Sequence, residues 1–218
     1  MEIYTLTTLY IIVMELFLTL ILLRILKKYT PNITTKASLI FFGWFFTTLL
    51  LLNVIKIIPH DISSFALFSL VLLGVGLSGI FFYLLKEAFL ALPQELLLMP
   101  QAFRMFFGAG FIVEAVYGIM PKTYGVVDGI MHITTAFLAL TLAIWIARGC
   151  KCTRSLILVN LFGLLDIVIV AYGISFFILQ EIGTEHNVFL AVFYVAPIFI
   201  WLHLISLYKV WLDTKSQN

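Results

Sequence analysis

The chain of 218 residues is 63% hydrophobic and only 11% charged, and it carries a formal net charge of +2. Soluble domains carry about a quarter charged residues, so the composition excludes a soluble globular protein. The small net charge does not indicate a nucleic-acid partner. Seven helical crossings of a bilayer would use about 140 to 150 residues, which leaves no room for a soluble domain. We therefore predict a single all-α integral membrane domain over residues 1–218, with the lipid bilayer as its partner.

Apolar runs separated by loop signals predict a bundle of about seven transmembrane helices. The first apolar run has no basic segment before it and is interrupted by Glu15, so we expect it to be retained rather than cleaved as a signal peptide. Most Lys and Arg residues fall on one side of the predicted bundle, which places the N-terminus outside and the C-terminus in the cytoplasm. The expected spans are 5–26, 37–58, 64–85, 99–119, 127–147, 155–179 and 188–210.

Ionisable residues inside the spans are the candidate functional residues, because a charge at membrane depth is costly and seldom kept without a role. Glu15 and Asp166 are expected near the bilayer midplane, where an unpaired carboxyl group would be protonated. Arg104 is expected about one turn inside the cytoplasmic boundary. At that depth it can extend its charge to the interface, pair with another group, or bind a substrate or an anion.

A second group is expected in the outer third of the membrane, where Glu114 and His132 lie at similar depth with Asp128 just above. Asp128 and His132 are four residues apart and share one helix face, so the carboxylate can orient the imidazole as a base or a ligand requires. The structural alternative is a hydrogen bond near the interface. The sequence allows Glu114 to join the same cluster.

The two cysteines lie in a basic loop that we place on the reducing cytoplasmic side, so we expect Cys150 and Cys152 to be free thiols. A metal site on the outer face would need four residues to converge, namely His60, Asp128, His132 and His186. No two of them have a recognised ligand spacing. We therefore predict no metal site and no cofactor.

Several motifs in the second half of the chain resemble an uncharacterised family of small bacterial inner-membrane proteins with several spans. The motifs are Gln101-Ala102-Phe103-Arg104, Gly118-Ile119-Met120-Pro121, Asn160-Leu161-Phe162-Gly163-Leu164-Leu165 and His203-Leu204-Ile205-Ser206-Leu207. The resemblance covers roughly residues 92 to 210 and implies a multi-pass protein of the bacterial cytoplasmic membrane, but no reaction. Where the family tends to show Gly-Asn-Phe-Asp, this chain has Gly125-Val126-Val127-Asp128, so only Asp128 carries over and His132 is specific to this chain.

A shorter run, Gly76-Leu77-Ser78-Gly79, resembles the nucleophile motif of rhomboid intramembrane proteases. That resemblance implies a dyad of Ser78 with His132, which lies two spans later and has a compatible topology. The chain lacks the His-x-x-x-Asn pattern expected for an oxyanion site. The structural alternative is that Gly76, Ser78 and Gly79 allow close helix packing.

The leading hypothesis is a protein that binds or translocates a small molecule or ion through an intramembrane polar pocket. Its expected ligand-binding residues are Glu114, His132, Asp128, Asp166, Glu15 and Arg104. The first alternative is an intramembrane hydrolase that works through His132 with Asp128 or Ser78. The second alternative is a structural membrane subunit in which the same residues only join helices.

Overall fold

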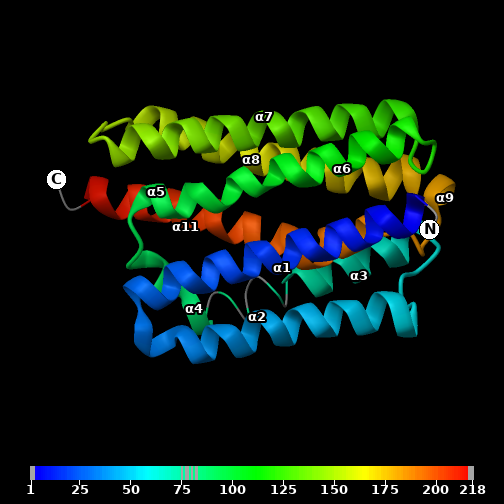
Figure 1. Ribbon diagram of the computed structural model, residues 1–218, viewed down its shortest axis with the longest axis horizontal. Helices are drawn as coiled ribbons and strands as arrows, with labels where there is room; N and C mark the ends of the chain where they lie inside the picture. The colour runs from blue at the N-terminus through cyan, green and yellow to red at the C-terminus, as the bar shows by residue number, and fades with distance from the viewer. Residues whose placement is uncertain (1–2, 75, 77–78, 80, 82, 216–218) are drawn as a thin grey trace.

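The computed structural model describes residues 3–74, 76, 79, 81 and 83–215, and every regular element in these ranges is a helix (Figure 1). Short η segments, which are 3₁₀ or π turns, join several of the α-helices into longer rods. In chain order the elements are α1 (Ile3–Tyr29), η1 (Pro31–Ile33), α2 (Thr34–Leu49), η2 (Leu50–Ile55), α3 (Ile62–Gly74), α4 (Tyr83–Leu90), α5 (Gln94–Leu98), η4 (Met99–Phe103), α6 (Arg104–Val116), α7 (Lys122–Ala147), α8 (Thr153–Gly173), η5 (Ile174–Ile178), α9 (Leu179–Ile182), α10 (Val188–Leu190), η6 (Ala191–Val195) and α11 (Ala196–Lys215).

Six helical segments of the described chain are long and apolar enough to cross a membrane. They are Ile3–Tyr29, Pro31–Ile55, Gln94–Val116, Lys122–Ala147, Thr153–Phe176 and Val188–Lys215. The seventh span, expected over 64–85, contains residues outside the described ranges; α3 (Ile62–Gly74) covers its first part, and α4 (Tyr83–Leu90) begins near its end. The seventh crossing and the direction of the bundle in the membrane therefore stay predictions. The two termini lie at opposite ends of the bundle (Figure 1).

The segment that carries Arg104 begins earlier than the sequence indicates. We expected a span over 99–119, but helical structure runs from Gln94 to Val116, with Pro93 in an extended conformation just before it. Pro100 is accommodated in a 3₁₀ turn inside the segment, so it does not end the helix. Arg104 therefore lies about three helical turns from the start of its segment rather than one.

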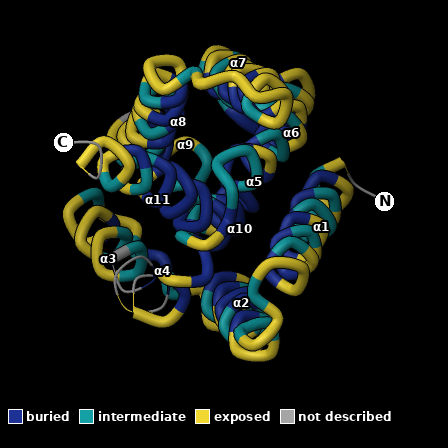
Figure 2. Tube along the Cα trace, turned by 90° about the vertical axis from the view of Figure 1, so that its left-hand side faces the viewer, coloured by how far each residue is buried: buried dark blue, intermediate teal, exposed yellow. Residues whose placement is uncertain are grey.

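The last segment, α10 to α11, occupies the centre of the bundle (Figure 2). In its most apolar stretch 78% of the residues are buried, against 28% to 50% in the other five segments. A helix that is apolar on all faces is most stable when other helices surround it, as they do in this central position. Polar side chains on α11 consequently have protein rather than lipid as their neighbours.

A π turn, η6, precedes Pro197 in this central rod and widens it. Proline has no backbone N–H, so the carbonyl of Phe193, four residues earlier, loses its normal helical partner. The indole Nε1–H of Trp44 on α2 donates to that carbonyl at 3.0 Å. The α2 helix therefore satisfies the backbone group that the proline leaves free.

We expect Trp44→Phe to destabilise the fold by about 1 to 3 kcal/mol, the usual cost of a buried polar group left without a partner. The substitution retains the aromatic ring and removes only the donor. Thermal unfolding in detergent measures the effect. Trp145→Phe, on an exposed side chain, is the matched control. Equal stability of the two variants would contradict the role assigned to Trp44.

Glycines bring α6 and α7 into close contact. A Cβ atom on Gly108 would lie 2.5 Å from the carbonyl oxygen of Gly129, and one on Gly129 would lie 2.6 Å from the carbonyl oxygen of Gly108. Small residues allow helix backbones to approach in this way. The contact fixes the position of His132, whose Cβ would lie 2.9 Å from a Cβ on Gly108.

The loop between α7 and α8 brings the two cysteines together. The Cα atoms of Cys150 and Cys152 lie 5.3 Å apart, a distance that a disulfide can span, so the expectation of free thiols stays a prediction. Gly149 adopts a positive φ of 93°, which turns the chain sharply after α7. The turn brings two side chains that are separated by one residue close enough to bond.

Candidate functional site

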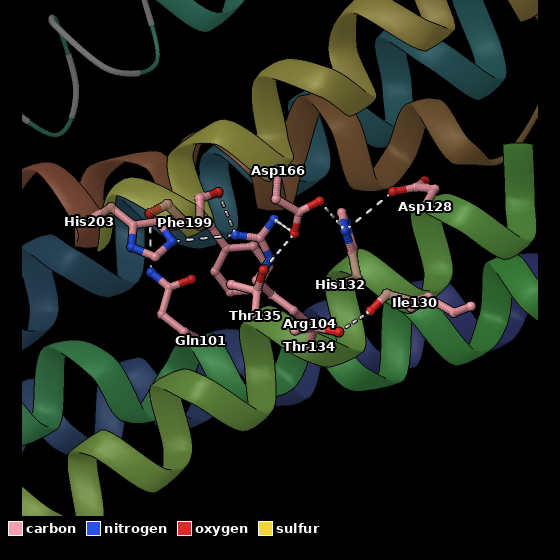
Figure 3. A network of polar contacts seen from close by, with 11 residues as sticks. Gln101, Arg104, Asp128, Ile130, His132, Thr134, Thr135, Asp166, Phe199 and His203 are labelled. Carbon is pink, nitrogen blue, oxygen red and sulfur yellow. Dashed lines mark hydrogen bonds and ion pairs between the residues drawn. The ribbon is translucent and has the colours of Figure 1, made fainter. Parts of the chain in front are cut away.

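A buried ion pair between α6 and α8 forms the centre of the site (Figure 3). Arg104 Nη2 lies 2.6 Å from Asp166 Oδ2, and both side chains are fully buried. Arg104 Nη1 also donates to the carbonyl oxygen of Gly163 at 3.0 Å. The interpretation that Arg104 extends its charge to the interface was therefore wrong, because the early start of its helix places it deep in the protein.

His132 on α7 lies between two carboxylates. Its Nδ1 atom is 3.2 Å from Asp166 Oδ1 and 3.3 Å from Asp128 Oδ1. Thr135, one turn further along α7, donates its hydroxyl to Asp166 Oδ2 at 2.8 Å. Neither oxygen of Asp128 accepts a hydrogen bond among the described residues, although that side chain is 98% buried. The Asp128–His132 pair predicted from their spacing is thus present, and Asp166 joins it from another helix.

The charges of this group do not balance when His132 is neutral and both carboxyl groups are ionised. Arg104 then contributes one positive charge, whereas Asp128 and Asp166 contribute two negative charges. One further positive charge would make the group neutral. In a low-dielectric interior an uncompensated charge is strongly unfavourable, so the group has the electrostatic character of a site for one monovalent cation.

Arg104 also begins a chain of hydrogen bonds that ends at Gln94. The donor and the acceptor of each bond in this chain are determined. Its Nη1 lies 3.3 Å from His203 Nε2, and because arginine can only donate, the other ring nitrogen of a neutral His203 carries the proton. That Nδ1–H donates to Asn160 Oδ1 at 2.9 Å, and Asn160 donates to Ser206 Oγ at 2.9 Å. Ser206 in turn donates to Gln94 Oε1 at 2.9 Å.

The family motifs of the sequence contain Asn160, Gly163, His203 and Ser206, but sequence reasoning assigned none of them to the site and missed Gln94. The available signal was periodicity, since Asn160 and Gly163 are three residues apart on α8, as are His203 and Ser206 on α11. Gly163 is required here because a Cβ atom at this position would lie 2.3 Å from the His203 ring.

A small cavity of about 40 Å³ lies beside the ion pair. Arg104 and His132 are its only polar lining residues among the described part of the chain. The other walls are three phenylalanines and short aliphatic side chains from α8, η6 and α11, namely Phe107, Phe111, Phe199, Ile167, Val170, Ala191, Val192, Val195 and Ala196. The volume exceeds the roughly 10–15 Å³ that one water needs and is too small for an organic ligand.

Glu114 does not share the contacts of His132, which differs from the single cluster that the sequence allowed. Its Oε1 accepts a hydrogen bond of 2.7 Å from Asn187, whose amide also donates to Thr7. Its Oε2 lies 4.0 Å from His186 Nε2, and neither atom has a hydrogen-bond partner among the described residues. Glu114 thus contacts the residue just before α10, which also contacts α1, whereas His132 contacts Asp166 on α8.

The ionisation of His186, in the loop before α10, is set by its surroundings. The backbone N–H of Val188 donates to Nδ1 at 3.1 Å, which leaves the proton of a neutral ring on Nε2. Burial lowers the pKa of His186, although the carboxylate of Glu114 and the carbonyl of Ile119 oppose this shift. His186 is therefore held in its neutral form in the fold.

This shift predicts that acid destabilises the protein through His186. The unfolded chain takes up a proton near pH 6.5 whereas the folded chain takes it up at a lower pH, so stability falls as the pH drops through that window. We expect the melting temperature of the wild type to fall more than that of His186→Gln between about pH 7.5 and 5.5. His60→Gln, at an exposed position, should behave like the wild type. An identical pH profile for all three proteins would contradict the prediction.

One other predicted residue, Glu15, lies apart from the network. Glu15 is buried on α1 with an unpaired Oε1 atom among the described residues, and its backbone carbonyl accepts a hydrogen bond from Thr19. It makes none of the contacts of Asp166, with which the sequence grouped it by depth. Ser78 lies outside the described residues, so the proposed dyad with His132 stays a prediction.

The comparisons with known proteins concern the part of the chain that contains the site. The model of a family described as a domain of unknown function, DUF8737, matches residues 62–211, which is more than half of the chain. The chain belongs to this family. No curated protein and no solved structure matches it. The matched region includes the whole DUF8737 network from Gln94 to Ser206, whereas Glu15 and Trp44 lie before it.

The membership confirms the expectation of an uncharacterised family, and the matched residues 62–211 contain the stretch of about 92 to 210 on which that expectation was based. It assigns no reaction and no ligand to this DUF8737 protein. The function must therefore be inferred from the geometry of the buried network.

Proposed function

We propose that this protein is a membrane carrier that binds one monovalent cation, in the simplest case a proton, at His132 between Asp128 and Asp166. The observation that carries the proposal is the position of His132 Nδ1, 3.2 and 3.3 Å from two buried carboxylates of which Arg104 neutralises only one. A proton on His132 makes the group neutral. The imidazolium N–H then lies between both carboxylates.

The same three residues offer the kinds of atoms that bind a metal ion, all within 4.8 Å of one another. A divalent ion would leave the group with one excess positive charge in the membrane interior, because Arg104 is already present. A monovalent charge leaves no excess. The presence of Arg104 therefore favours a proton or an alkali cation over zinc or calcium.

Transport requires that the cation can reach both sides of the membrane, and the distribution of polar groups supports such a route. Hydrogen-bonded side chains extend from Arg104 to Gln94 at one end, and the Glu114 cluster with His186 lies towards the other end. Polar groups at membrane depth commonly mark ion pathways. A location in the bacterial cytoplasmic membrane, with the N-terminus outside, completes the proposal.

Proton flux in proteoliposomes tests the proposed function. A potassium diffusion potential drives protons, and an enclosed pH dye records the change. We expect the wild type and His60→Gln to conduct above the level of empty liposomes, and His132→Gln to return to that level. Nitrogen NMR of labelled histidines reports separately whether the ring of His132 binds the proton.

Two results would contradict this proposal. If His132→Gln conducted like His60→Gln, the cation would not bind at His132. If no protein conducted and the ring of His132 stayed neutral at every pH tested, the residues would only join helices, as in a structural subunit.

A further inference from the structure

Arg104 presents a hydrogen-bond donor to the cavity beside the ion pair. Arg104 lines it, and the Nε atom of this buried side chain has no hydrogen-bond partner among the described residues. Its Nη atoms are already engaged with Asp166, Gly163 and His203. An arginine donor left without a partner in a dry site costs free energy unless a ligand or water accepts its proton.

His132 can supply a second donor to the same cavity. Its Nδ1 atom faces the carboxylates, so Nε2 is the ring nitrogen left for another partner. The ring lies 5.7 Å from that of Phe111, which also lines the cavity. When His132 binds the proton proposed above, Nε2 carries an N–H as well, and the cavity then contains two cationic N–H groups.

The remaining walls are apolar and suit a small ligand rather than an organic molecule. Phe107, Phe111 and Phe199 surround the space, and the guanidinium of Arg104 lies over the ring of Phe199. The volume of about 40 Å³ admits a monatomic ion or one or two waters. No carboxylate lines this cavity among the described residues.

We propose that this cavity binds a small monovalent anion such as chloride between Arg104 and protonated His132, so that the carrier moves an anion together with a proton. The inference rests on the proposed function, because the anion needs the positive charge on His132. Without that proton the group already has one excess negative charge, and an anion would add a second. The charged and titratable groups around His132 are Asp128, Asp166 and Arg104, with Tyr124 and His203 beyond them.

Thermodynamic linkage makes the proposal quantitative. If anion binding requires one proton, chloride affinity rises by up to about tenfold per unit fall in pH over the range in which His132 takes up its proton. By reciprocity, saturating chloride makes His132 hold its proton more tightly by the same factor.

Binding of radioactive chloride to the full chain in nanodiscs, measured at several pH values, tests the inference. We expect one chloride per protein, with affinity that rises as the pH falls. Val192→Phe fills the cavity without removing a polar group, so it should abolish chloride binding and leave protonation of His132 in place. Val168→Phe, the same substitution on an exposed face of α8, is the matched control and should bind like the wild type.

The outcomes separate this inference from the proposed function. Absence of chloride binding in a protein whose His132 still binds a proton would overturn the anion site alone, leaving water in the cavity. Binding that is independent of pH, or that persists in Val192→Phe, would also overturn it. Absence of both chloride binding and protonation of His132 would overturn the proposed function as well.

Discussion

Replacing Arg104 with methionine is expected to destabilise the folded protein by about 3 to 5 kcal/mol, the usual cost of removing one partner from a buried ion pair. The expected size follows from the complete burial of both side chains and their separation of 2.6 Å. Methionine fills a similar space but leaves Asp166 and Asp128 as two carboxylates against one imidazole. The free energy of unfolding in mixed micelles measures the loss.

A double substitution separates the loss of the ion pair from the loss of side-chain packing. In Arg104→Met combined with Asp166→Leu, both charges are gone, and we expect most of the stability to return because apolar replacements of a buried pair are often neutral. Arg154→Met removes an exposed arginine at the start of α8 and should change stability by less than about 0.5 kcal/mol. If Arg104→Met were as stable as Arg154→Met, the buried pair would not exist in the membrane.

Gly108→Ala is the second substitution with a large expected effect, at about 1 to 3 kcal/mol or more. Its new methyl group would lie 2.5 Å from the carbonyl oxygen of Gly129, which is backbone and cannot rotate away. The α6 and α7 helices must therefore separate, and His132 moves with α7. We expect proton flux to fall together with thermal stability.

The same change elsewhere in the chain provides the control. Gly43 on α2 has no atom within 4 Å of the position that a Cβ would occupy. Gly43→Ala should leave the fold unchanged or stabilise it by up to about 1 kcal/mol, because alanine favours a helix more than glycine does. If the two alanine variants unfolded at the same temperature, the helices would not be in the close contact described.

Much of the fold follows from the sequence because the bilayer restricts what an apolar chain can do. Six of the seven expected spans correspond to apolar helices of sufficient length, and the pairing of Asp128 with His132 follows from their spacing on one helix. The motifs of the second half also indicated the family before its model was matched. Each of these features depends only on residues that are near one another in the chain.

The tertiary structure alone decided which groups from different helices meet. The membrane depths expected from the sequence grouped Asp166 with Glu15, and Glu114 with His132. In the structure Asp166 pairs with Arg104, and Glu114 pairs with Asn187. Depth gives only the position along the membrane normal, whereas contact depends also on the rotation of each helix about its axis. That rotation is set by close packing at sites such as Gly108 and Gly163, where a single methyl group would separate the elements that form the network.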